Sequence, residues 1–144
     1  MTAVAGKATV GAPMGNAKQM ARVIYDFAAD GGTVGALDLL ETTDDIVITN
    51  FYIRGITVLD SAGDGVTMDV GVSGGDTDIL LNGIAEADFS AGAMLLAPVV
   101  EGAPNVFAMP LKLEADGKII QTIIGEALTS GKCEYFFEYQ KFGA

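Results

Sequence analysis

The sequence predicts an all-β domain in which two antiparallel sheets pack as a sandwich. Apolar and polar residues alternate with a period of two in several stretches, 19 of the 144 residues are glycine, and no helical stretch is long enough for a βαβ crossover. A chain of this length suits one domain. We expect about eight strands. A jelly roll is our preferred arrangement, although strand count alone does not separate it from an immunoglobulin-like sandwich.

Residues 1–19 are predicted to be an extended, flexible N-terminal arm, and residues 20–144 to be the sandwich domain. The arm is rich in Ala and Gly and has few large side chains, so it buries little area to offset the cost of ordering it. Its basic residues, continued by Arg22, precede the first acidic residue, Asp26. Such an arm either improves solubility or reaches an acidic neighbouring subunit. We predict three contact residues from it: Lys7, Lys18 and Arg22.

The first half of the domain contains three predicted strand regions. From residue 20 onward apolar and other residues alternate, which indicates a strand that continues until Asp30-Gly31-Gly32 turns the chain: Val23, Tyr25 and Phe27 alternate with Arg22, Ile24 and Asp26. Residues 34–40 fit either a short strand or a helical turn. Residues 46–59 are rich in β-branched and aromatic residues and form one long strand or two, with bulges expected at Asn50 and Gly55. A short hairpin turn at residues 61–65 is expected to follow.

The clearest local pattern comes next, where residues 66–72 alternate between apolar and polar side chains and predict a half-buried strand. Two glycines break the strand, short acidic side chains cap the following turn, and residues 76–81 are expected to form one or two helical turns that stop at Asn82-Gly83. We assign a structural turn role to four residues here: Gly74, Gly75, Asp76 and Asp78.

The C-terminal third contains four more predicted strands. Residues 93–100 read as a covered strand, and residues 106–114 and 118–128 flank Ala115-Asp116-Gly117. An Asp-Gly pair between two apolar runs is a strong hairpin signal. The chain ends with an amphipathic strand in which Cys133, Tyr135, Phe137 and Tyr139 alternate with Glu134, Phe136, Glu138 and Gln140.

The last strand carries aromatic residues on both faces, which is more than a one-sided surface strand needs. Phe136 and Phe142 are therefore predicted subunit contacts, with cover by the arm or by a loop of the same chain as the alternative.

The sequence DVGVSGGDTD of residues 69–78, followed by ILLNG, resembles a segment found in small structural proteins of tailed bacteriophages. The similarity extends over residues 46–96. It implies a jelly-roll virion protein of the kind that decorates or cements the capsid or forms head fibres.

The candidate catalytic residues predict that the chain is not an enzyme. The chain has no histidine, which excludes Ser-His and Cys-His nucleophiles and, with one cysteine, a Cys/His zinc set. Glu134 and Glu138 are about 13 Å apart along one strand, too far for glycoside hydrolysis, and are expected to lie on a solvated strand face. Residues 71–75 lack the Lys-Ser/Thr ending of a phosphate loop. Cys133 is expected to be a buried small hydrophobe.

A calcium site is an alternative interpretation of five loop and strand carboxylates, because calcium prefers oxygen ligands. The turn-capping interpretation is preferred because two of the five follow a glycine pair and the spacing fits no EF-hand. We therefore predict no metal and no cofactor. The five residues are Asp60, Asp64, Asp69, Asp76 and Asp78.

The net charge of −11 argues against nucleic-acid binding, and no apolar run approaches the roughly 20 residues that span a bilayer. With the resemblance, the prediction is a decoration or cement protein on the outer surface of a phage head. It would be made in the host cytoplasm, form a homo-oligomer, preferably a trimer, and bind the major capsid protein. The alternatives are a head-fibre or tail-associated module that binds host glycan, and a jelly-roll shell subunit.

Overall fold

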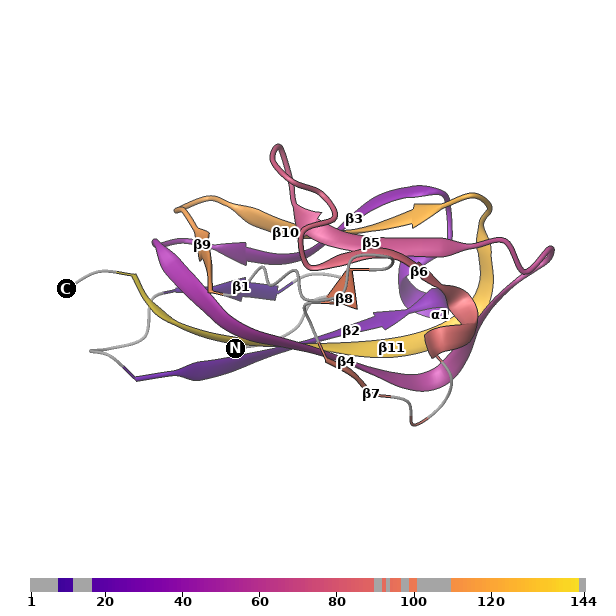
Figure 1. The fold of residues 1–144 in the computed structure, drawn as a ribbon, viewed down its shortest axis with the longest axis horizontal. Coiled ribbons are helices and arrows are strands. Elements are labelled where there is room, and N and C mark those ends of the chain that lie inside the picture. Colours follow the sequence, from indigo (N-terminus) through magenta and orange to yellow (C-terminus); the bar gives the residue numbers. More distant parts are fainter. Residues whose placement is uncertain are drawn as a thin grey trace.

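The structure, a computed structural model, describes residues 8–11, 17–89, 92, 94–96, 99–100 and 110–142. In these ranges the chain forms two sheets packed face to face, with β3, β5 and β10 in one layer and β2, β4 and β11 in the other (Figure 1). The elements are β1 (Ala8–Val10), β2 (Gln19–Asp26), α1 (Phe27–Asp30), β3 (Gly35–Thr42), β4 (Ile46–Ser61), β5 (Thr67–Val72), β6 (Leu81–Ala85), the 3-10 helix η1 (Glu86–Phe89), β7 (Met94–Leu96), β8 (Val99–Val100), β9 (Leu111–Leu113), β10 (Lys118–Ile124) and β11 (Leu128–Lys141).

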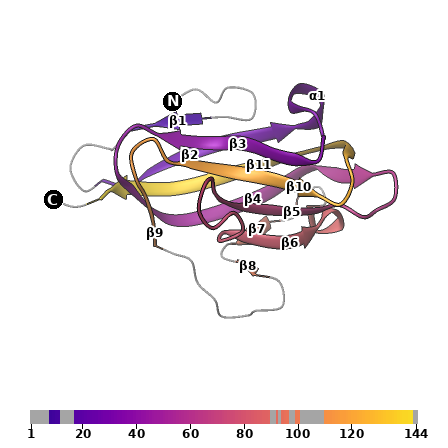
Figure 2. The same cartoon turned by 90° about the horizontal axis from the view of Figure 1, so that it is seen from above.

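The strand order confirms the predicted all-β sandwich. One sheet has the order β1-β3-β10-β5-β6-β8, and the other has the order β2-β11-β4-β7 with β9 also paired to β4 (Figure 2). The pairings are antiparallel apart from β1 with β3 and β6 with β8. This order is consistent with a jelly roll, which stays a prediction. Neither helix of the described residues is long and apolar enough to cross a membrane.

The core lies between the sheets and follows the predicted alternation of β11. Cys133, Tyr135, Phe137 and Tyr139 are buried, and the rings of Tyr135 and Phe137 stack with Phe51 of β4 at centroid distances of 6.1 and 5.1 Å. Burial raises the pKa of the Cys133 thiol to about 12, as expected for a small buried hydrophobe.

The region predicted as one strand or two is the single strand β4, which spans 16 residues. Ile48 and Asn50 pair with two consecutive residues of β11, so Thr49 is an extra residue in β4. Gly55 and Thr57 also pair with two consecutive residues of β11, so Ile56 is a second extra residue. The extra residue in each case lies next to Asn50 or Gly55, so the predicted bulge positions are confirmed.

Two predicted hairpins are wrong. Residues 61–65 connect β4 in one sheet to β5 in the other, and Asp116-Gly117 likewise connects β9, which pairs with β4, to β10, which pairs with β3 and β5. The Asp-Gly turn itself forms: Asp116 has a φ of 66° and Gly117 N–H donates to the Glu114 carbonyl at 2.8 Å. Turn residues reverse the chain locally, but partners distant in sequence decide which sheet each strand joins.

Residues 34–40, for which the sequence left a strand or a helical turn open, belong largely to the strand β3. The helical turn predicted at residues 76–81 is wrong. Val72 N–H donates to the Asp76 carbonyl and Leu80 N–H donates to the Val70 carbonyl, at 2.8 and 2.9 Å. These bonds close a wide loop between β5 and β6. Leu81 begins β6 because its buried side chain joins the core.

Part of the predicted arm belongs to the sandwich. Ala8 and Val10 of β1 are buried, and this strand forms a parallel edge beside β3. Arg22 lies within β2. Residues 1–7, with Lys7, and residues 12–16 lie outside the described residues. The division at residue 19 therefore stays a prediction.

Candidate functional site

The outer face of the five-stranded sheet carries two of the predicted contact residues. Phe136 of β11 faces Arg22 of β2 on one side and Tyr52 of β4 on the other, and paired residues of an antiparallel sheet share a face. Glu134 and Arg54 form the next pair. We call these five residues, with their strands, the β2–β11–β4 face. Arginine and aromatic side chains together are typical of protein interfaces.

Glu134 has an unusual position on this face, because it points away from the core yet is only 1% exposed. Its carboxylate accepts from Nε of Arg22 and lies 3.1 Å from Nη2 of Arg54. The two guanidinium groups cover the charge that they neutralise. The prediction that Glu134 lies on a solvated face is therefore wrong, since period-two patterning assigns a face but not the side chains that lie across it.

The second predicted arm residue on the described chain is also ion-paired within the molecule. Lys18 Nζ lies 3.4 Å from Oε1 of Glu138, which also accepts from the Thr49 hydroxyl at 2.8 Å. Lys18 and Arg22 each keep 57% of their side chains exposed, so both remain accessible from the solvent. Their roles in docking stay predictions.

The structure does not bring Phe136 and Phe142 together. Phe136 is half-buried in the middle of β11, whereas Phe142 follows the end of that strand, about 20 Å away by strand rise. Phe142 is exposed, and Lys112 Nζ lies 4.3 Å from its ring centroid in a cation–π contact.

The predicted turn at Gly74 and Gly75 forms, but no helical turn follows it. Gly74 has a φ of 77° and Gly75 N–H donates to the Val72 carbonyl at 3.2 Å. Asp78 N–H donates to Oδ1 of Asp76 at 3.4 Å, and a hydrogen bond between the two side chains raises the pKa of Asp78. These contacts are those of a turn. The structural role assigned to the four residues of this turn stays a prediction.

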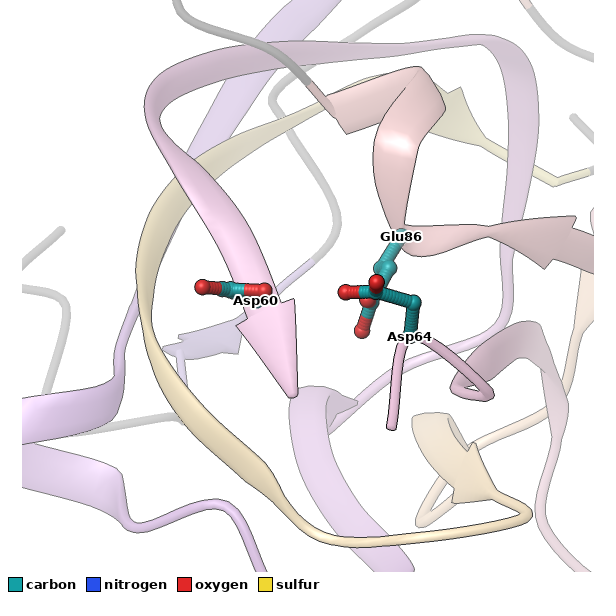
Figure 3. A group of neighbouring side chains, drawn as sticks. All are labelled: Asp60, Asp64 and Glu86. Carbon is teal, nitrogen blue, oxygen red and sulfur yellow. The ribbon is translucent and has the colours of Figure 1, made fainter. Parts of the chain in front are cut away.

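A separate acidic cluster is formed by residues near the end of β4, in the loop that follows it and at the start of η1 (Figure 3). Asp60, Asp64 and Glu86 each offer one carboxylate oxygen, and the three oxygens lie within 4.8 Å of one another. Two of them belong to the five carboxylates raised by the sequence. Asp69 is separated from this group and accepts from Gly83 N–H at 2.7 Å.

Sequence reasoning missed Glu86, because it is 22 residues from Asp64 and no spacing motif links them. The link is topological. Thr67 at the start of β5 faces Ala85 at the end of β6, so a residue shortly before β5 and the residue just after β6 become neighbours.

Comparisons with known proteins give two matches of fold. No family model matches the chain, and no curated protein matches its sequence. A chain of the capsid asymmetric unit of cyanophage Pam1 is similar, with a TM-score of 0.56 and 19% identity over 93% of this chain and 91% of that one. A chain of the capsid of Ralstonia phage GP4 is similar with a TM-score of 0.59 and 14% identity over 95% of this chain and 100% of that one. At these identities the likeness shows a shared fold.

Proposed function

We propose that this chain is a structural protein of a tailed-phage virion that decorates or cements the outer surface of the head. The observation that carries the proposal is its likeness, over nearly the whole of both chains, to chains from two phage capsid structures. The high coverage in both directions means that the matched chains are about as short as this one. A short chain favours an auxiliary capsid protein over a shell subunit. The phage-like segment of residues 69–83 supports the same conclusion independently.

The β2–β11–β4 face is the proposed surface for contact with the major capsid protein or with a second copy of this chain. It presents Arg22, Arg54 and two aromatic side chains, Tyr52 and Phe136, on rigid paired strands. Each guanidinium group has five N–H donors, and the bonds to Glu134 occupy a minority of them. The remaining donors are available to an acceptor on a partner.

The proposed mechanism is multivalency. Subunits of a homo-oligomer, which we take to be a trimer, would bind neighbouring capsomers at the same time, so that each weak contact is strengthened by those already made. The charge of −11 keeps a densely decorated particle soluble. No catalytic group takes part.

The first experiment counts copies of the chain in purified particles of the phage that encodes it, by quantitative mass spectrometry against the major capsid protein. Hundreds of copies per particle are expected. A few dozen or fewer would contradict decoration, and binding of the isolated protein to a glycan array would favour the host-glycan alternative.

The second experiment adds purified variants to heads that lack the protein and measures occupancy. Phe136→Ala should lower occupancy at least tenfold, whereas Ile124→Ala, which truncates an exposed apolar side chain on the other sheet, should leave it unchanged. Equal occupancy for both variants would remove the β2–β11–β4 face from the proposal. The arm is tested by removing residues 1–7, because removal of residues 1–19 would also delete the buried strand β1.

A further inference from the structure

We infer that Asp60, Asp64 and Glu86 form a calcium-binding site that ties the two sheets together at one end of the sandwich. The inference is independent of the virion role, because it rests on the side chains of this cluster alone.

The buried carboxylate of Glu86 is the observation that points to a cation. Glu86 is 5% exposed, and its Oε2 atom has no hydrogen-bond partner among the described residues. Burying a charged oxygen without a partner costs several kcal/mol, so native structures normally neutralise it. In Figure 3 the Glu86 side chain extends toward Asp64, with the Asp60 carboxylate facing the same space.

The protein itself does not supply the missing positive charge in the part of the chain that the structure describes. Residues 55–111, which contain all three carboxylates, include no Lys or Arg. Lys141 lies beside Ile46, at the opposite end of β4 from Asp60. Six of the eight basic residues pair with carboxylates outside the cluster: Lys18, Arg22, Arg54, Lys112, Lys118 and Lys132.

The spacing of the three oxygens suits one calcium ion. Calcium binds oxygen at about 2.3–2.6 Å, so two oxygens on the same ion are at most about 5 Å apart. The three carboxylate oxygens meet this condition. A depression of about 400 Å³, lined by Asp60, Asp64, Glu86 and neighbouring residues, leaves room for the water molecules that would complete six or more ligands.

The ligand chemistry distinguishes calcium from other metals. The side-chain ligands that the described residues bring together here are three carboxylates, the chain has no histidine, and Cys133 is buried in the core, so zinc and copper are not favoured. Magnesium usually takes one or two carboxylates in a strict octahedron, whereas three carboxylates from three separate segments fit the more adaptable shell of calcium.

The loop that carries Asp64 is already held in place. The Glu126 carboxylate accepts from the Ser61 hydroxyl at 2.5 Å and from the N–H groups of Gly63 and Gly65 at 2.9 Å each. Asp64 adopts a φ of 56°, a left-handed conformation that Asp and Asn tolerate better than most residues. The bound ion would join β4 of one sheet to the β6–η1 junction of the other.

The test is thermal unfolding of the full chain in 10 mM CaCl2, in 10 mM MgCl2 and in EDTA, at equal ionic strength, with calorimetric titration of calcium. We expect calcium to raise the Tm by about 4–10 °C, from mass action at a Kd of about 0.1–1 mM and the usual Tm shift per unit of stability. Magnesium should raise it by less than half as much. An unchanged Tm in calcium would overturn the site, and an equal rise in magnesium would overturn its assignment to calcium.

Three variants locate the ion. Glu86→Gln should abolish the calcium-dependent rise and have a Tm in EDTA at least as high as that of the native protein, because it removes an unpaired buried charge. Asp64→Asn keeps the left-handed conformation and should weaken calcium binding at least tenfold. Asp76→Asn, an equal change of charge in a different exposed loop, should keep the full rise. If Asp64→Asn and Asp76→Asn behave alike, the ion binds elsewhere and the assignment fails.

Discussion

Substitution of Arg22 by alanine tests whether the buried charge of Glu134 depends on both of its arginine partners. A hydrogen bond to a charged group contributes about 1.5–3 kcal/mol, and loss of a partner from a fully buried ion pair costs about 3–5 kcal/mol. The Arg22 and Arg54 side chains are 57% and 46% exposed, so water reaches the Glu134 carboxylate once one of them is removed. We therefore expect Arg22→Ala to lower the free energy of unfolding by about 1–2 kcal/mol, below the full cost for a buried pair.

The double variant Arg22→Ala/Arg54→Ala should lose more than the sum of the two single variants. Each arginine alone still neutralises Glu134, whereas removal of both leaves the carboxylate uncompensated at a cost of about 3–5 kcal/mol. Urea unfolding at pH 7, followed by circular dichroism, measures each variant. Lys18→Ala is the matched control, because Lys18 is as exposed as Arg22 and pairs on the same face with Glu138, and it should cost less than about 1 kcal/mol.

Two results would refute this reasoning. A change of less than about 0.5 kcal/mol for Arg22→Ala would mean that water already solvates Glu134. A loss of the same size in a Glu134→Gln background would mean that Arg22 acts through some other contact. Urea unfolding uses the isolated protein without capsid. The same variants therefore measure the structural role of Arg22 separately from its predicted role in docking.

Two further predictions concern the loops. Gly71→Ala should lower the free energy of unfolding by about 2 kcal/mol or more in urea, because the added Cβ would lie 2.4 Å from the Asp76 carbonyl oxygen. Gly75→Ala is the control and should have no measurable effect, because its Cβ meets its neighbours at 3.6 Å or more. Similar losses for the two variants would contradict the crowding argument. Hydrogen bonds from the Ser61 hydroxyl and two loop N–H groups hold the pKa of Glu126 below its usual range, so this carboxylate stabilises the fold above its unfolded pKa of about 4.3 and loses that effect as the pH falls through the folded pKa. Glu126→Gln should therefore reduce the fall in stability below about pH 5, and equal pH profiles would contradict the assignment.

The parts of the fold that were predicted correctly are those that local pattern determines. The alternation of Tyr135 and Phe137 with polar neighbours assigns the inner face of β11, because side chains of a strand point to opposite faces in turn. Local pattern does not determine which strands pair with one another. Asp116-Gly117 makes the predicted tight turn, yet β9 and β10 join different sheets, because β10 gains its partners from β3 and β5, which are distant in the sequence.

The candidate sites show the same division. Phe136 could be assigned to the outer face of the last strand from its position in the pattern, and the structure places it there. Glu86 could not be linked to Asp60 and Asp64, since their proximity depends on the pairing of β5 with β6. The burial of Glu134 was likewise invisible, because it results from arginine side chains on two other strands.

The ion pairs of Glu134 and the proposed docking role of the β2–β11–β4 face are compatible, and the first would assist the second. Ordering a long side chain at an interface costs about 0.5–1.5 kcal/mol, and this cost is paid on binding if the side chain is free beforehand. Glu134 already restrains Arg22 and Arg54 while leaving about half of each side chain exposed. A partner carboxylate or carbonyl would thus meet two guanidinium groups that are partly ordered before contact. In an assembly of many copies, this lower ordering cost applies at every contact. Because the contacts of linked subunits reinforce one another, it strengthens the binding of the whole oligomer.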